Sequence, residues 1–328
     1  MTWKLLKFAL PLAAALLSGA ALAKDKPEVV TVVQAAGVPW SNGIEKGIRK
    51  GGGEFGLDVS VVGPDAADPA RQAELVEGLI ARKVDAIGLI PLDTRVMEPV
   101  LQRAAAAGIP IITHEASWQK TKTWNVDLVD AKEFAEIQME ALARSMGGEG
   151  EYVVLVGSPT APLQSFWAQA AVDYQMAKYP KMTLIDRLPG ADEVDRAYNL
   201  VKDLIPAYPN LKGIVSFGWN GPIGAGNAVR ESGLQGKISL TGTCLPGPAR
   251  ELILGGVVQE CFLWSPIDAG YAMMAVARLV LDGKEIADGM EVPGLGKVAV
   301  HPAAHTIRAN QILRINKDTV DTLIDAGL

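Results

Sequence analysis

The chain has 328 residues, of which 49% are hydrophobic and 6% aromatic, and its formal net charge is −6. This length accommodates one large domain or two smaller ones with separate cores. The acidic balance and the scattered Lys and Arg argue against a nucleic-acid partner, which requires a basic face to neutralise phosphates. The sequence has no low-complexity tail, so we expect almost the whole chain to fold.

Residues 1–23 have the pattern of a secretory signal peptide. Two lysines precede an apolar stretch that Pro11 interrupts, and Ala21 and Ala23 fit the rule of small residues before a cleavage site. We therefore expect cleavage near Ala23 and a periplasmic mature protein that begins near Lys24. The alternative is an uncleaved membrane anchor, although the apolar stretch is shorter than the ~20 residues that a spanning helix needs.

The first half of the chain alternates strands and helices with short links. Runs of β-branched residues predict strands, and segments with helical spacing of apolar residues lie between them. The expected strands are 29–37, 57–64, 85–92 and 109–116, and the expected helices are 41–56, 68–84 and 95–108. This alternation is typical of a doubly wound parallel sheet. Gly51, Gly52 and Gly53 are unusual inside a helix, because each interior glycine costs about 1 kcal/mol relative to alanine.

The same alternation resumes after a seam at residues 115–127. The expected helices are 131–147, 163–180, 194–209, 223–233 and 248–256, and the expected strands are 150–159, 182–190, 211–219, 237–244 and 257–264. One more helix follows within 265–283, and residues 312–328 supply a terminal strand and helix. The fold class is therefore α/β, with two doubly wound, Rossmann-like lobes.

Cys244 and Cys261 each lie at an end of an expected strand, with a short helix between them. Neighbouring parallel strands could bring their Cα atoms within reach of a disulfide, and an exported protein experiences oxidising conditions. The alternative is a pair of buried thiols that act as small apolar residues.

Several motifs resemble the type I periplasmic sugar-binding proteins of ABC importers, and the resemblance covers the whole mature chain. The motifs THEAS (113–117), GSPT (157–160), FLWSPIDAGY (262–271) and ILRINKDTVD (312–321) are similar to the branch that includes rhamnose-binding and autoinducer-2-binding proteins. The most specific of them is the LW-x-P-x-D-x-G pattern within the third.

This resemblance implies two lobes joined by a three-strand hinge, with crossovers near residues 113–117, 262–266 and 298–302. The N-terminal lobe would comprise residues 24–114 and 265–300, and the C-terminal lobe residues 115–264 and 301–328. The ligand would be one small sugar or polyol bound between the lobes, without a cofactor. The expected partner is an ABC permease at the inner membrane, the alternative partner is a membrane sensor, and the protein is expected to be a monomer.

The segment VSFGWNGPIGAG (215–226) raises the question of a phosphate-binding loop. The Gly-Lys-Ser/Thr of a P-loop is absent, and the glycine spacing does not match a dinucleotide fingerprint. Ligands of open α/β sheets bind beyond the carboxyl ends of the strands, where this loop lies. Trp219 can cover the apolar face of a sugar ring, and the Asn220 amide can bond to hydroxyls. The alternative is a core tryptophan beside turn-forming glycines.

Other expected strand ends supply the rest of a sugar site. They carry tryptophans, amides, carboxylates and a hydroxyl, which are the groups that bind carbohydrates. The candidate ligand-binding residues are Gln34, Trp40, Asp93, His114, Glu115, Gln164, Trp167, Phe217, Trp219, Asn220, Thr243 and Trp264.

The chain departs from autoinducer-2-binding relatives at several of these positions. Gln34 replaces a lysine, Leu163-Gln164 replaces an Asp-Gln pair, and Glu115 replaces an aspartate. We therefore expect a neutral sugar or related polyol, and keep an autoinducer-2-like signal as the alternative.

The sequence gives little support to an enzyme or a metal protein. His301 and His305 are spaced as i and i+4, but the segment lacks the Glu of H-E-x-x-H and Pro302 disfavours a helix there. The two cysteines lack metal-site spacing, and no G-x-S-x-G motif is present. The closest approach to an acid–base pair is His114 beside Glu115, but adjacent strand residues point to opposite faces. We expect no metal and no catalysis, with a hydrolase or isomerase as the enzyme alternative.

Overall fold

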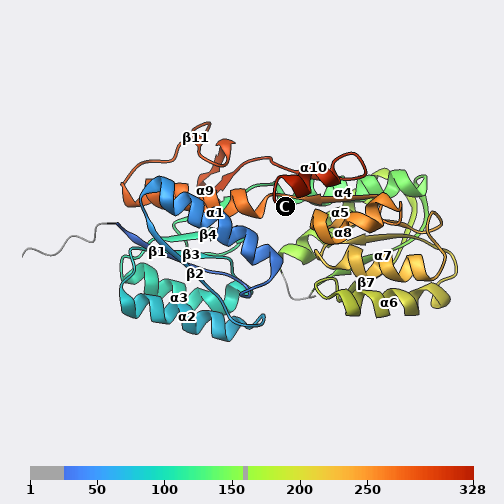
Figure 1. Ribbon diagram of the computed structural model, residues 1–328, viewed down its shortest axis with the longest axis horizontal. Coiled ribbons are helices and arrows are strands. Elements are labelled where there is room, and N and C mark those ends of the chain that lie inside the picture. Colours follow the sequence, from blue (N-terminus) through green and yellow to red (C-terminus); the bar gives the residue numbers. More distant parts are fainter. Residues whose placement is uncertain (1–25, 158–161) are drawn as a thin grey trace, which may run out of the picture.

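The structure is a computed structural model that describes residues 26–157 and 162–328. Two lobes, each a β-sheet between layers of helices, lie side by side along the long axis of the molecule (Figure 1). The expected signal peptide (1–23) and residues 158–160 of the GSPT motif lie outside the described residues. Within the described part of the chain, no helix combines the length and apolarity needed to cross a membrane.

The N-terminal lobe is built on a sheet with strand order β13-β14-β5-β4-β3-β1-β2, whose central strands pair in parallel. Helices cover both faces of this sheet (Figure 1), so β3 and β4 are buried throughout. The first elements in chain order are β1 (Glu28–Val32), α1 (Pro39–Phe55), β2 (Asp58–Val62), α2 (Pro69–Arg82), β3 (Ala86–Leu89), α3 (Thr94–Ala106), β4 (Ile111–His114) and β5 (Trp124–Asp127).

Glycines let α1 pack directly against α9 (Pro266–Leu281), which returns to this lobe from far along the chain. A Cβ atom on Gly47 would lie 1.9 Å from the carbonyl oxygen of Ile267. On α9, a Cβ atom on Gly270 would lie 2.1 Å from the carbonyl oxygen of Ile44. The two helices therefore touch backbone to backbone, and a side chain at either glycine would force them apart.

The three consecutive glycines near the end of α1 have different environments. A Cβ atom on Gly51 would lie 2.8 Å from Met274 Cβ of α9, and one on Gly52 would lie 2.4 Å from Val59 Cγ2 of β2. A Cβ atom on Gly53 would meet nothing within 4 Å. Close packing on two sides thus explains Gly51 and Gly52, while nothing in the structure explains Gly53.

The C-terminal lobe has a second sheet of order β15-β10-β9-β8-β6-β7, with β15 antiparallel to β10. Its elements in chain order are α4 (Ala131–Met146), β6 (Glu149–Val156), α5 (Pro162–Lys178), β7 (Lys181–Pro189), α6 (Val194–Ala207), β8 (Leu211–Ser216), α7 (Gly221–Glu231), β9 (Ser239–Thr243), α8 (Pro246–Leu254) and β10 (Glu260–Leu263). After α9, the chain adds β11 (Glu291–Val292), β12 (Gly296–Lys297), β13 (Ala299–His301), β14 (Thr306–Arg308), β15 (Leu313–Ile315) and α10 (Val320–Asp325).

The chain passes between the lobes, in the part that the structure describes, through residues 128–130, 264–265 and 309–312. The first and third crossovers lie side by side, because the Ala309 N–H donates a hydrogen bond of 2.9 Å to the Asp127 carbonyl. These three segments are the hinge of the two-lobed fold.

The sheets divide the chain differently from the expected lobe boundaries. The sequence pattern assigns residues 115–127 and 301–308 to the C-terminal lobe, but β5 pairs with β4, and β14 pairs with β5. Both segments therefore belong to the N-terminal lobe, and two of the three crossovers lie about 10–15 residues later than expected. Strands of three or four residues are too short to show a clear period of two, which is why the sequence did not reveal them.

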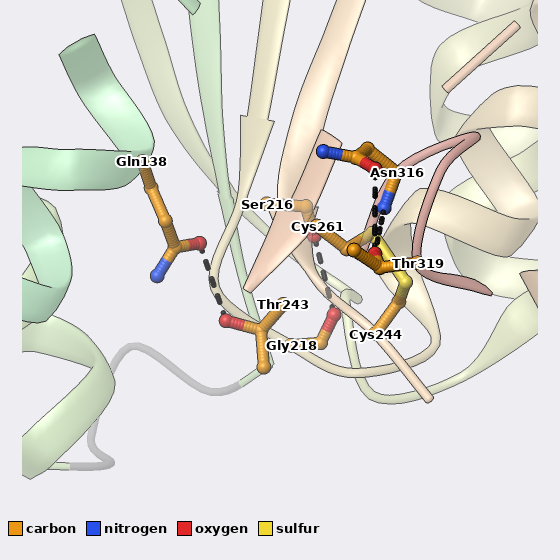
Figure 2. Close-up of a disulfide and its surroundings, with 8 residues drawn as sticks. All are labelled: Gln138, Ser216, Gly218, Thr243, Cys244, Cys261, Asn316 and Thr319. Carbon is orange, nitrogen blue, oxygen red and sulfur yellow. Dashed lines mark hydrogen bonds between the residues drawn. A yellow bond between two sulfur atoms is a disulfide. The ribbon is translucent and has the colours of Figure 1, made fainter. Parts of the chain in front are cut away.

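Cys244 and Cys261 form a disulfide that joins the end of β9 to β10 (Figure 2). Their Cα atoms are 5.7 Å apart, and both residues are fully buried. The parallel pairing of β9 with β10 sets this distance, because Cys261 lies opposite Gly242 in the register. The bond closes the loop that contains α8, directly after Thr243.

Candidate functional site

A cavity with a volume of about 160 Å³ lies between the lobes, where strand ends of both sheets face each other. The N-terminal lobe lines it with Gln34, Trp40, Pro91, Leu92, Thr94, Glu115 and Trp118. The C-terminal lobe and the crossover at Trp264 line it with Leu163, Gln164, Trp167, Asp192, Phe217, Trp219, Thr243, Leu263 and Trp264. Each of these residues ends a strand, follows one, or lies in the first turns of the next helix. This is the position at which open α/β sheets bind ligands.

Three tryptophans form one continuous aromatic wall of the cavity. The ring centroid of Trp264 lies 5.5 Å from that of Trp40, with the planes at 87°, and 5.9 Å from that of Trp167, at 63°. Trp264 also packs edge to face against Phe134 of α4, at 5.1 Å. These contacts across the hinge hold the rings of the wall in defined orientations before any ligand arrives.

The loop that holds Trp219 is packed against the loop after β7. A Cβ atom on Gly218 would lie 2.5 Å from the carbonyl oxygen of Ala191, and one on Gly221 would lie 2.9 Å from Ala191 Cβ. The glycines of this segment therefore serve close packing of two loops, rather than a phosphate. Trp219 itself stays partly buried and faces the cavity.

A hydrogen-bonded network presents polar groups from the C-terminal lobe. Gln164 accepts a hydrogen bond from the Gly157 N–H, and its Nε2 donates to Asp192 Oδ1 over 3.1 Å. Asn220 Nδ2 donates to the Asp192 carbonyl over 2.9 Å. A Cβ atom on Gly157 would lie 1.6 Å from Asp192 Oδ2, so only glycine fits beneath this carboxylate. The network fixes Gln164 and Asp192 where both line the cavity.

Thr243 is also held in place by a hydrogen bond, to a side chain of α4. Its hydroxyl donates to Gln138 Oε1 over 3.2 Å, as Figure 2 shows, and the Gln138 amide in turn donates to the Phe134 carbonyl over 3.1 Å. The Thr243 oxygen therefore retains lone pairs that can accept a hydrogen bond from a ligand.

His114 forms hydrogen bonds within the hinge and does not line the main cavity. Its Nδ1–H donates to the Val126 carbonyl over 2.6 Å, and its Nε2 accepts from the Trp264 indole N–H over 3.2 Å. Burial lowers the pKa of His114 to about 4, so the ring is neutral at neutral pH and can act as the acceptor. It ties β4 and β5 of one lobe to the crossover into the other.

The carboxyl groups of Glu115 and Asp192 line the cavity, and Asp127 lies beside Glu115. No Lys or Arg is among the described residues that line the cavity. Burial, followed by the negative charges of Asp127 and Asp192, raises the pKa of Glu115 to about 8. Burial also raises the pKa of Asp127 to about 6, against the influence of the Asn125 side chain and of Arg308, and raises the pKa of Asp192. Glu115 is therefore protonated at neutral pH and can donate as well as accept.

Glu115 departs from ordinary strand geometry. Its φ angle of 56° lies in the left-handed region, which non-glycine residues rarely adopt. The strand β4 has already ended at His114, so the alternation that would separate the two side chains no longer applies. As a result Glu115 Oε1 lies 3.6 Å from His114 Nε2, so the expectation that the two side chains point to opposite faces is wrong. Glu115 lines the main cavity, and the His114 ring stays buried at the hinge.

Nine of the twelve candidate residues line the cavity, namely Gln34, Trp40, Glu115, Gln164, Trp167, Phe217, Trp219, Thr243 and Trp264. The other three lie elsewhere. Asp93 caps α3, where its carboxylate accepts from the backbone N–H groups of Arg95 and Val96. His114 and Asn220 make the hinge and loop contacts described above.

The sequence interpretation missed Asp192 and Trp118. Asp192 follows β7, and Trp118 lies a few residues after β4, so both obey the strand-end rule that found the other residues. A search of every strand end, including the one after the Pro-Gly of residues 189–190, would have found Asp192.

The described residues hold no group of three or more His, Cys, Asp or Glu side chains arranged to bind a metal ion. His301 ends β13 and His305 follows a short 3₁₀ turn, so their i,i+4 spacing does not place them on one face of an α-helix. His305 instead lies beside Trp124, with ring centroids 5.8 Å apart.

The two-lobed fold and the cavity between the lobes define a solute-binding protein of the type I class. The family model of the periplasmic binding protein domain matches residues 29–285. The chain belongs to this family, and family membership indicates an extracytoplasmic location.

Individual relatives are similar at moderate identity. A xylitol-binding protein from Mycolicibacterium smegmatis is 29% identical over 52% of this chain and 48% of its own length. A D-apiose import binding protein from Actinobacillus succinogenes is 24% identical over 70% of this chain and 74% of its own length. The chain thus matches only about half of the first of these proteins.

A crystal structure of a solute-binding protein from Clostridium phytofermentas with bound L-rhamnose has a TM-score of 0.82, at 24% identity, over 92% of this chain and 99% of that one. The likeness confirms the fold that the sequence resemblance implies.

Proposed function

We propose that the protein is the solute-binding component of a sugar ABC importer and that its cavity binds one neutral monosaccharide or related polyol. The observation that carries this proposal is the convergence of tryptophans, amides and carboxyls from both lobes on the cavity between them. Relatives named for binding xylitol and D-apiose support the same class of ligand.

The size of the cavity favours a single ring. An engineered protein cavity of about 150 Å³ accommodates benzene, and this cavity measures about 160 Å³. Stacking on Trp219 or on the aromatic wall would cover the C–H face of a sugar. Gln164, Thr243 and Glu115 together offer both donors and acceptors to its hydroxyl groups.

The charge of the cavity favours a neutral ligand. Its ionisable lining side chains, among the described residues, are the carboxyls of Glu115 and Asp192. A phosphate or a sugar acid would meet carboxyls without a Lys or Arg to pair with it, which is unfavourable in a partly desolvated site. The nine lining residues that the sequence singled out are the proposed ligand contacts.

The hinge allows the two lobes to close on the ligand. A ligand that touches both lobes binds the closed form better than the open form and so shifts the population toward closure. We propose that the mature protein begins near Lys24, acts as a periplasmic monomer, and presents the closed form to a permease. Presentation to a membrane sensor would use the same closed form, and uptake of labelled sugar by a deletion strain separates the two roles.

We further propose that the ligand leaves the protein unaltered. A thermal-shift screen of pentoses, hexoses, deoxysugars, polyols and sugar acids tests the binding class, because a ligand at 100 times its Kd adds about 2.7 kcal/mol of apparent stability. The tightest ligand is then incubated at stoichiometric concentration for hours and examined by NMR. Stabilisation by a neutral sugar that is recovered unchanged is expected. Stabilisation only by sugar acids, or a conversion that Glu115→Gln abolishes, would overturn the proposal.

A further inference from the structure

A second, smaller cavity of about 20 Å³ opens behind the floor of the main one. The two cavities share Glu115, Trp118, Leu163, Trp167 and Trp264. A single water-sized group needs roughly 10–15 Å³ of such volume. The side cavity therefore accommodates one oxygen-sized group attached to whatever occupies the main cavity.

The walls of this side cavity are polar on one side. Besides Glu115, it is lined by Asp127, at the end of β5, by Ser117 and by His114. Both ring nitrogens of His114 are already hydrogen-bonded, to the Val126 carbonyl and the Trp264 indole. Trp167 lines both cavities, and its indole N–H is buried without a hydrogen-bond partner among the described residues. A buried donor without an acceptor costs free energy, so an occupant of the two cavities that offers an acceptor to the Trp167 ring is favoured.

The combination of groups selects the chemistry of the occupant. Carboxyl oxygens of Glu115 and Asp127 can accept a hydrogen bond, whereas the Trp167 indole can only donate one. A hydroxyl satisfies both kinds of partner, because it donates one hydrogen bond and accepts others. An ammonium group would donate to the carboxyl oxygens but could not accept from the indole, and a methyl group would do neither.

We propose that the side cavity is a subsite for the hydroxymethyl arm of a pyranose, and that the protein therefore prefers an aldohexose over the pentose or the 6-deoxy sugar with the same ring stereochemistry. This inference rests on the proposed function, since the ring of the same sugar would fill the main cavity. The arm would carry its hydroxyl between the carboxyls of Glu115 and Asp127 and the Trp167 ring.

Calorimetric titration of matched sugars tests the subsite. The sets are D-glucose, D-xylose and 6-deoxy-D-glucose; D-galactose, L-arabinose and 6-deoxy-D-galactose; D-mannose with D-lyxose; and D-allose with D-ribose. In the set that binds best, we expect the hexose to bind at least about tenfold more tightly than its partners, the effect of one hydrogen-bonded hydroxyl at a charged site. Equal affinities within the set would overturn the subsite and leave the proposed function standing.

Ala131→Val locates the effect, because Ala131 lines the side cavity and not the main one. The added methyl groups should remove the hexose preference while leaving the affinity for the pentose within about twofold. Ala70→Val, in the exposed first turn of α2, is the matched control and should leave every affinity unchanged. A hexose preference that survives Ala131→Val in folded protein would place the arm elsewhere and overturn the proposal.

Two further outcomes would contradict the subsite. Tighter binding of 6-amino-6-deoxy-D-glucose than of D-glucose would overturn the hydroxyl subsite in favour of an ammonium site. No binding of any sugar in the sets would overturn the subsite alone. The proposed function fails only if no neutral sugar or polyol of the wider thermal-shift screen stabilises the protein, which distinguishes the two failures.

Discussion

The two lobes share one architecture but hold their parts of the cavity differently. In the C-terminal lobe, Gln164, Asp192 and Thr243 are each fixed by hydrogen bonds to neighbouring loops or helices, and a disulfide closes the chain just after Thr243. In the N-terminal lobe, Gln34 makes a single long hydrogen bond of 3.3 Å to the Pro91 carbonyl. The cavity groups of the C-terminal lobe are thus preorganised to a greater degree.

The stability of the lobes also comes from different sources. The N-terminal lobe depends on the glycine-mediated contact between α1 and α9, which joins segments more than 200 residues apart in sequence. The C-terminal lobe is closed locally by the Cys244–Cys261 bond, whose partners are separated by 17 residues. The comparison predicts that a packing defect unfolds the first lobe, while loss of a covalent bond weakens the second.

The largest expected effect is on the N-terminal lobe. Gly47→Ala should lower the free energy of unfolding by more than about 3 kcal/mol, the upper end of ordinary overpacking, because its new methyl group would meet the backbone of α9. Gly53→Ala, in open space on the same helix, is the control and should stabilise by up to about 1 kcal/mol. Urea denaturation measures both, and equal stabilities of the two variants would contradict this packing account.

The disulfide should have the next largest effect. Replacing both Cys244 and Cys261 with alanine should cost about 3 kcal/mol of unfolding free energy, as expected for a closed loop of this size. Thiol titration of denatured, unreduced periplasmic protein should find no free thiol from this pair. Two full equivalents would show that the residues serve only as buried packing groups.

The third prediction concerns ligand binding by the C-terminal lobe. Trp219→Ala should weaken sugar binding by about 1–3 kcal/mol, because a partly buried indole that faces the cavity would no longer cover the ring. The unfolding midpoint of the ligand-free protein should change little. Unchanged affinity, measured by calorimetry against the tightest sugar, would remove Trp219 from the binding site.

The last prediction is a dependence of stability on pH, which originates in the N-terminal lobe. The pKa of Glu115 rises from 4.5 to about 8 on folding, so its contribution is complete below pH 4.5 and is lost as the pH rises through about 8. Wild-type melting temperature should therefore fall between pH 5 and about pH 8.5 more steeply than that of Glu115→Gln. Parallel melting curves for the two proteins would contradict the assigned environment.

The sequence predicts much of this architecture. The alternation of β-branched runs with helical patterns predicts both sheets, and the strand-end rule predicts most of the cavity. The strand-end rule fails where a side chain forms a hydrogen bond with a nearby backbone group instead of facing the cavity. Asp93 and Asn220 occupy helix N-cap positions, where the backbone N–H groups or the neighbouring loop attract their side chains.

The remaining differences have physical reasons as well. The short strands β5 and β14 are stabilised by pairing with distant segments, and three or four residues carry no periodic signal of that pairing. The backbone of Glu115 is left-handed, so the rule that adjacent strand residues point to opposite faces does not apply to it. The side cavity depends on the packing of α4 against the first crossover, which no local pattern predicts.

Native mass spectrometry of the mature protein, equilibrated with an equimolar mixture of neutral monosaccharides, sugar acids and sugar phosphates, tests the central claim most directly. The account predicts a complex with one neutral monosaccharide per chain, and loss of that complex in Trp219→Ala. A protein that selects an acid or a phosphate from the mixture, or that stays unliganded even when polyols are added to it, would contradict it.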